Sequence, residues 1–334
     1  MKKFLVITSI AGSDNDVLKT LDKEAKKENV DYVLIGDRKS PKEVHFEHCK
    51  FYSIDQQEKL PYTFTKVCPY DHYTRKNIGY LVAIENKADL IYETDDDNIP
   101  YETFWDLDSK ANKVSAIEGE GWVNVYQYFS EKNVWPRGLP LDDVRTKYKL
   151  DDSENTSEIE TPIIQGLADD NPDVDAIYRF IGELPVKFKK NLEVVLKKNQ
   201  WCPFNSQNTI WKPKAFPLLY LPATCSFRMT DIWRSFIAQR IAWEYDWGIL
   251  FRSSTVYQKR NEHNIYKDFE DEISGYLNNK MIGKEFSKLN LSDDYSNIYS
   301  NLRKCYELLY DMELVQKLEL ELVDHWINDV QKLR

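Results

Sequence analysis

The strongest constraint on the fold is an alternation of short apolar runs with helical patterns within the first 95 residues. Two segments between or after these runs are typical of helices: residues 17–27 are charged, and residues 75–88 carry apolar side chains at helical spacing. Four runs have the length and apolar character of buried strands: 4–10, 32–35, 51–54 and 90–92. This order predicts an α/β fold with a mainly parallel N-terminal sheet and helices on both faces.

Three of these predicted strands have polar segments at their carboxyl ends, at residues 8–11, 36–38 and 95–97. In an open parallel sheet, ligands bind in the crevice at the carboxyl ends of the strands. The three polar segments are therefore expected to line one crevice.

The last of these segments is three consecutive aspartates, Asp95, Asp96 and Asp97, directly after a buried strand. Side-by-side carboxylates repel each other, and a divalent cation removes the repulsion. Mg²⁺ and Mn²⁺ prefer such oxygen ligands and commonly also bind the phosphates of a substrate. A solvated acidic turn would explain the same residues without any chemistry. The position at a strand end favours the metal site, and both interpretations stay open.

Composition excludes several other classes of protein. The chain has 334 residues, is 42% hydrophobic and carries a formal net charge of −10, so it can bury a large core but lacks the basic surface expected of a nucleic-acid-binding protein. No apolar run approaches the roughly 20 residues of a membrane span. The five cysteines form no CxxC pair. These features predict a cytoplasmic protein with reduced thiols and no transmembrane segment.

The pattern changes near residue 270, and we predict a catalytic domain at residues 1–268 followed by a helical C-terminal extension at residues 269–334. The extension could pack on the first domain or form a homodimer through its helices. Apolar residues in the extension recur every three or four positions: Leu302, Cys305, Leu308, Met312, Val315, Leu318, Leu322, Trp326 and Val330.

In the middle of the chain, residues 122–129 are predicted to form a strand.

Several segments occur in an order that carries a family resemblance: GDRKSP (36–41), IYETDDDN (91–98), WPRGLPL (135–141), QGLADDNPDVDAIYRF (165–180), MTDIWRSFIAQR (229–240) and QKRNEHN (258–264). Together they resemble the STELLO glycosyltransferases, a group similar to the reversibly glycosylated polypeptides that act as UDP-arabinopyranose mutases. The resemblance covers about residues 1–270. It implies a GT-A fold, which is a Rossmann-like fold that binds a nucleotide sugar and a metal through a D-x-D motif.

The same resemblance implies roles for individual residues. Asp95, Asp97 and His263 would bind Mn²⁺ or Mg²⁺. Independently of the resemblance, aromatic faces suit the C–H surfaces of sugars, so Trp135 or Trp201 is expected at the site, unless both pack in the core. The other implied substrate contacts, including cations suited to a diphosphate, are Asp37, Arg75, Lys76, Asp95, Asp96, Lys259 and Arg260.

Four residues are candidates for catalysis. Arg137 would hold a sugar or phosphate, or is merely an exposed loop arginine. Asp231 would act as a general base on the acceptor hydroxyl, or it is the cap of the helix that follows. Asp173 and Asp175 are rivals for the base role. No base is needed if the reaction retains configuration.

We therefore expect a metal-dependent glycosyltransferase that moves a sugar from a nucleotide-sugar donor to a glycan or other acceptor, in surface polysaccharide synthesis. A nucleotide-sugar pyranose–furanose mutase is the first alternative. The second is a non-catalytic scaffold that binds nucleotide sugars and assists another synthase.

Overall fold

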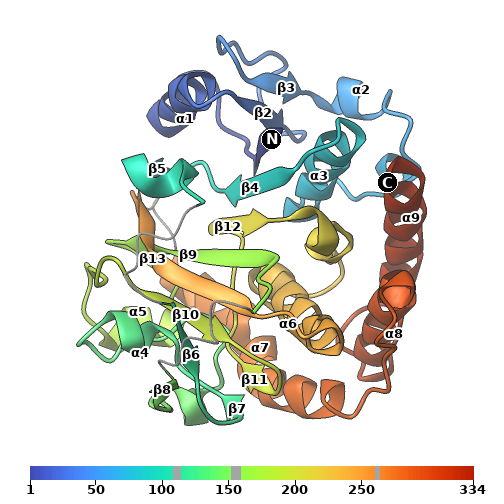
Figure 1. Ribbon diagram of the computed structural model, residues 1–334. Coiled ribbons are helices and arrows are strands. Elements are labelled where there is room, and N and C mark those ends of the chain that lie inside the picture. Colours follow the sequence, from blue (N-terminus) through green and yellow to red (C-terminus); the bar gives the residue numbers. More distant parts are fainter. Residues whose placement is uncertain (108–113, 152–158, 260–263) are drawn as a thin grey trace.

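The computed structural model describes residues 1–107, 114–151, 159–259 and 264–334. Within these residues, a mixed sheet of eleven strands runs through the molecule, and helices cover both of its faces (Figure 1). One strand, β5 (Asn98–Pro100), pairs only with β13 at the side of the main path. The order along the main path is β3 (Lys50–Tyr52), β2 (Val30–Ile35), β1 (Lys3–Thr8), β4 (Leu90–Thr94), β12 (Asn208–Trp211), β9 (Ile163–Asp169), β13 (Ile249–Gln258), β10 (Glu193–Leu196), β6 (Val114–Ile117) and β8 (Leu150–Asp151).

The N-terminal part of the sheet is parallel, as predicted, because β3, β2, β1 and β4 all run in one direction. Successive strand residues point to opposite faces. Leu5 therefore packs in the core with α1 (Asp16–Lys27), whereas Val6 packs on the other face with α3 (Lys76–Glu85). The α3 helix lies so close to β1 that a Cβ added at Gly79 would come within 2.6 Å of Val6.

The rest of the sheet is mixed. β12 runs antiparallel to its neighbours β4 and β9, whereas β13 runs parallel to β9. The carboxyl ends of β1, β4, β9 and β13 consequently lie along the same edge. This α/β arrangement with a helical C-terminus agrees with the predicted fold class.

The C-terminal helices are α7 (Ile265–Phe286), α8 (Ile298–Asp311) and α9 (Lys317–Leu333). The predicted amphipathic pattern is confirmed for most of α8 and α9, but Leu318 is exposed, and Met312 and Val315 lie in the turn between the two helices. Their apolar faces pack into the main core of the same chain, and α8 and α9 lie side by side (Figure 1). Trp326 of α9 donates its indole N–H to the carbonyl of Pro217, 2.9 Å away. Asp329 accepts the backbone N–H of Phe64 at 2.7 Å.

The middle of the chain contains one clear error of prediction. Residues 122–129 are not a strand: β7 (Gly121–Trp122) is two residues long, and α4 (Tyr126–Phe129) follows it. The Asn124 side chain accepts the backbone N–H of Tyr126 at 3.1 Å and donates to two backbone carbonyls, which favours a turn over an extended chain. The remaining elements are α2 (Ile54–Gln57), α5 (Ala176–Ile181), β11 (Gln200–Trp201) and α6 (Thr230–Ala242).

None of the helices in the described ranges is long and apolar enough to cross a membrane. All five cysteines have free thiols. The cytoplasmic location stays a prediction.

Candidate functional site

A pocket of about 470 Å³ opens at the strand ends that the sequence marked as polar. It collects residues from the ends of β1, β2 and β4, from the loop before α5 and from the start of α6. The lining residues are Thr8, Ser9, Ile10, Asp37, Lys39, Asp71, His72, Tyr73, Asp95, Asp96, Asp97, Arg137, Asp173, Gln207, Phe227, Arg228, Asp231 and Gln258.

Asp95, Asp96 and Asp97, which we call the acidic corner, begin where β4 ends. Asp95 accepts hydrogen bonds from the Tyr73 hydroxyl at 2.7 Å and from the Lys76 ammonium at 3.3 Å. Removal from water raises the pKa of Asp95 to about 7; Lys76 opposes this rise, and the charge of Asp97 adds to it. The predicted aspartates therefore share one pocket, and one of them titrates near neutral pH.

The other two aspartates of the acidic corner are anchored by neighbouring strands. Asp96 accepts a short hydrogen bond from the Ser9 hydroxyl after β1. Asp97 accepts the side-chain N–H of Gln258 at 3.0 Å, at the end of β13. The ends of β1 and β13 thus hold two of the three carboxylates of the acidic corner.

The two basic residues at the start of α3 have different surroundings. The buried Lys76 ammonium lies behind the acidic corner, where it also contacts Glu93 at 3.8 Å. Arg75 does not line the pocket: it is fully buried, and it donates to Gln57 at 2.6 and 3.0 Å. Only Lys76 of this pair therefore contacts the acidic corner.

Asp37, at the end of β2, lines the pocket but is already heavily hydrogen-bonded. Its carboxylate accepts the backbone N–H groups of Arg38 at 2.8 Å, Asp71 at 2.9 Å and His72 at 3.0 Å. Asp37 therefore holds the loop that forms one wall of the pocket.

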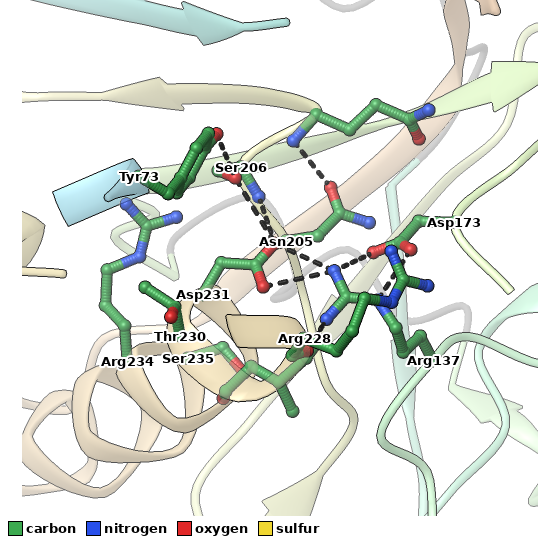
Figure 2. A network of polar contacts seen from close by, with 12 residues as sticks. Tyr73, Arg137, Asp173, Asn205, Ser206, Arg228, Thr230, Asp231, Arg234 and Ser235 are labelled. Carbon is green, nitrogen blue, oxygen red and sulfur yellow. Dashed lines mark hydrogen bonds and ion pairs between the residues drawn. The ribbon is translucent and has the colours of Figure 1, made fainter. Parts of the chain in front are cut away.

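A second group, Arg137, Asp173 and Asp231, forms what we call the arginine cluster (Figure 2). Arg137 donates to both oxygens of Asp173, at 2.8 and 2.7 Å, and to both oxygens of Asp231, at 3.1 and 3.0 Å. Although burial alone would lower the pKa of Arg137, the two carboxylates raise it well above its usual value. Arg137 is therefore permanently charged.

Asp231 lies at the start of α6. Burial pushes the pKa of its carboxyl upward, but the charges of Arg137 and Arg234 outweigh this effect and lower it. Asp231 also accepts the backbone N–H and the hydroxyl of Ser206, at 3.1 and 3.2 Å. Its carboxylate is thus held ionised by neighbours on several sides.

Ser206 and Tyr73 connect the two groups. Their hydroxyls lie 2.7 Å apart, and Ser206 donates to Asp231 (Figure 2). Because Tyr73 also donates to Asp95, a continuous chain of contacts runs from Asp95 through Tyr73 and Ser206 to Asp231. Sequence reasoning missed both residues because they are 133 positions apart and neither belongs to a recognisable motif. Gln258, in contrast, lies inside the QKRNEHN segment and could have been chosen.

Arg228 also lines the pocket and was not predicted as a site residue. Its backbone carbonyl accepts a short hydrogen bond from Arg137. Its guanidinium donates to Glu272 of α7 at 2.8 and 3.0 Å. The α7 helix therefore helps to position one wall of the pocket.

Besides Arg75 and Lys76, two more predicted residues do not line the pocket. Asp175 caps α5 by accepting the backbone N–H of Tyr178 at 2.7 Å, and it accepts the indole N–H of Trp135 at 2.7 Å. Burial raises the pKa of Asp175 to about 7, in spite of these two hydrogen bonds. Neither Asp175 nor Trp135 is among the residues that line the pocket.

The predicted metal ligands are only partly described. Lys259 donates its backbone N–H to the carbonyl of Asp97 at 3.0 Å, so the QKRNEHN segment begins beside the acidic corner. Arg260 and His263 lie outside the described residues. In the described part of the chain, no three His, Cys, Asp or Glu side chains are grouped so as to hold a metal ion. Asp95 and Asp97 still offer the oxygen donors that suit Mg²⁺ or Mn²⁺, provided that water or substrate completes the shell.

The fold and the pocket define an α/β protein that presents carboxylates and arginines at the carboxyl ends of its strands. A family model described as STELLO glycosyltransferases matches residues 228–334. The Arabidopsis thaliana protein named "Probable glycosyltransferase STELLO1" is 30% identical and covers 72% of this chain and 33% of its own length. "Probable glycosyltransferase STELLO2" from the same plant is 26% identical, over 97% of this chain and 44% of its own length.

These findings confirm the resemblance predicted from the motifs: the chain is similar in sequence to the STELLO glycosyltransferases, and the family match extends past the predicted limit near residue 270. It spans less than half the length of these curated relatives. Among solved structures, a mycobacterial protein matches with a TM-score of 0.39 and 10% identity, over 84% of this chain and 75% of that one. A similarity this low carries no argument.

Proposed function

We propose that the chain is a metal-dependent glycosyltransferase that moves a sugar from a nucleotide-sugar donor to a hydroxyl group of a glycan. The observation that carries this proposal is the single pocket in which the acidic corner and the arginine cluster meet. The kinship with STELLO proteins supports the transferase class. The glycan acceptor and a role in surface polysaccharide synthesis stay predictions from the family resemblance.

The acidic corner is the proposed metal site. Asp95 and Asp97 would hold Mn²⁺ or Mg²⁺ through carboxylate oxygens, and His263 stays a proposed further ligand. A metal bound there would neutralise the charge on the leaving nucleoside diphosphate. Because Lys76 contacts Asp95, it offsets part of the repulsion in the acidic corner before any cation binds.

The nucleotide half of the donor is proposed to lie over the ends of β1 and β2. Asp37 and its backbone partners form that wall, and Lys39 and His72 line the same side. Asp96 is proposed to contact the ribose or waters. Lys259 and Arg260 are proposed to hold phosphate oxygens, because cations favour a diphosphate.

The arginine cluster is proposed to position the transferred sugar. Asp173 and Asp231 stay predicted catalytic residues, but the lowered pKa of Asp231 makes that carboxylate a weak base. Their ion pairs with Arg137 support a positioning role instead. In the transfer, the bond between the sugar and the diphosphate breaks, and a bond to the acceptor oxygen forms. The acceptor proton leaves to solvent or to the departing phosphate.

The geometry of Arg137 argues against the mutase alternative. A charged guanidinium is a poor nucleophile, and this one is enclosed by two carboxylates and a backbone carbonyl. Covalent sugar attachment at Arg137 would require one of these contacts to break and the group to lose a proton. We therefore rank transfer to an external acceptor above sugar interconversion.

A thermal-shift screen of nucleotide sugars, each with and without Mn²⁺, tests the proposal. Ligands that bind the native state raise the melting temperature. We expect one nucleotide class to stabilise the protein only when Mn²⁺ is present. A metal-independent hit, or none, would contradict the metal site. Conversion of UDP-arabinopyranose without acceptor, with the nucleotide retained, would indicate a mutase, and binding without turnover of any kind would indicate a scaffold.

A further inference from the structure

The α7 helix carries an exposed apolar stripe. It is 22 residues long, or about 33 Å. Its outward side presents large apolar side chains every three or four residues, and Tyr266 and Leu277 are 77% and 72% exposed. A contiguous exposed stripe on a helix is typical of an interaction surface. The stripe consists of Tyr266, Phe269, Ile273, Leu277 and Met281.

A neighbouring element extends this stripe into a patch. Phe180, at the end of α5, places its ring 5.1 Å from the ring of Tyr266 and 6.4 Å from that of Phe269. Ile181, next to it, is also exposed. The patch therefore spans two helices, and single exposed apolar residues scattered over a surface would not produce it.

We propose that α7 pairs antiparallel with α7 of a second copy of the chain, around a two-fold axis near Gly275. In that register, Ile273 of one copy lies level with Leu277 of the other. Phe269 likewise lies level with Met281, a favourable pairing of sulfur with an aromatic ring. Because the axis repeats every contact, the apolar stripe is complementary to itself.

The charges on the helix follow the same register. Glu270 of one copy lies level with Lys280 of the other, and both side chains are more than half exposed. Tyr266 lies level with Lys284, which suits a cation–π contact. A parallel pairing would place Lys280 against Lys280. The charge pattern thus selects an antiparallel second copy.

A membrane surface is a poorer occupant of this face. Helices that lie on membranes carry lysine and arginine along the polar side. The polar side of α7 instead includes the acidic Glu270 and Asp271 near the most exposed aromatic residue. An anionic lipid surface would repel this end of the helix.

Dimerisation would also affect the pocket, because α7 supports one of its walls. On the inward side of α7, Glu272 binds Arg228 and accepts the backbone N–H of Ala176 at 2.7 Å. A partner helix packed on the outward side would restrain this support. The dimer itself does not depend on the proposed transfer reaction.

Sedimentation equilibrium of the whole chain over a wide concentration range tests the dimer. We expect reversible dimers, and at least about tenfold weaker association for Ile273→Glu or Leu277→Glu. Leu318→Glu is the matched control, because Leu318 is an exposed leucine on α9. Melting temperatures of the variants check the fold. A monomer at every concentration, or dimers unaffected by these changes, would overturn the proposal.

Charge reversal tests the register. Glu270→Lys and Lys280→Glu should each weaken the dimer, and the double variant should restore it, because each residue then meets its opposite charge in the other copy. Lys280 also contacts Asp142 at 3.0 Å, so the melting temperature of the single variant is measured as well. Additive loss in the double variant would exclude the antiparallel register. Binding to phosphatidylserine vesicles by a monomer, abolished by Leu277→Glu, would replace the dimer with a membrane contact.

Discussion

Two carboxylates in the same pocket, Asp95 and Asp231, have opposite environments. Removal from water raises the pKa of Asp95 to about 7; its two acidic neighbours add to this rise, and Lys76 opposes it. Asp231 is enclosed by Arg137, Arg234 and the backbone of Ser206, and its pKa falls. The acidic corner therefore has three carboxylates against one lysine and is suited to gain a cation, whereas in the arginine cluster both carboxylates are already ion-paired with Arg137.

The first test of this difference removes the positive charge of the arginine cluster, by Arg137→Ala. Two carboxylates would remain buried without their partner, so we expect the free energy of unfolding to fall by about 3–5 kcal/mol. Urea denaturation measures the change. The control is Arg38→Ala. Arg38 is exposed, and its ion pair with Asp71 is long, at 3.8 Å; such a surface pair contributes about 0–1 kcal/mol. Equal losses in both variants would show that the arginine cluster is not a tightly matched group.

The second test removes a carboxylate from the acidic corner, by Asp97→Asn. If Asp97 is a metal ligand as proposed, we expect sugar transfer to fall by about a hundredfold or more, and the stabilisation by Mn²⁺ to disappear. The protein without metal should keep nearly its full stability, since one of three repelling charges is gone. Asp55→Asn, an exposed carboxylate at the start of α2, is the matched control. An active Asp97→Asn variant would contradict the metal site.

The third test uses pH to separate the two carboxylates. Metal binding needs ionised Asp95, so a pKa of about 7 predicts roughly tenfold weaker Mn²⁺ binding at pH 6 than at pH 8. Without metal, Asp95 binds more protons in the folded state than in the unfolded state. Its contribution to stability is therefore lost as pH rises from about 4 to 7. The contribution of Asp231 to stability has the opposite pH dependence. It is present at neutral pH and is lost only as pH falls below the ordinary range of a carboxyl group.

Calorimetry of Mn²⁺ binding and melting curves across pH measure these effects. In Asp95→Asn, the rise in stability toward acidic pH should be reduced. Mn²⁺ affinity that does not change between pH 6 and 8 in the unaltered protein would show that Asp95 is not a ligand.

The test with the smallest expected effect concerns the hydroxyl that connects the acidic corner to the arginine cluster. Tyr73→Phe removes the hydroxyl that contacts both Asp95 and Ser206. Its loss should cost about 1 kcal/mol of stability. It should also raise the pKa of Asp95 further, because the hydrogen bond from Tyr73 lowers it. The pH midpoint of Mn²⁺ binding would then move upward. Tyr70→Phe, which removes a hydroxyl bound to the exposed Glu58, should leave the midpoint unchanged.

Sequence reasoning succeeded where the signal is local. The parallel strands, α1, α3 and the amphipathic C-terminal helices follow from apolar periodicity, and the acidic corner follows from its position after β4. It failed at residues 122–129, where the hydrogen bonds of one asparagine outweigh an extended pattern. It also placed Arg75 at the pocket, although packing turns this residue toward Gln57.

The sequence by itself determined the class of fold, the family resemblance and the run of aspartates at a strand end, because each depends on neighbouring residues or on their order. Tertiary structure alone decided that Arg137, Asp173 and Asp231 form one ion-paired group, and that Tyr73 and Ser206 connect it to Asp95. Those contacts join distant segments, and the charge state of each carboxylate depends on which groups and how little water surround it. No local pattern in the chain contains that information.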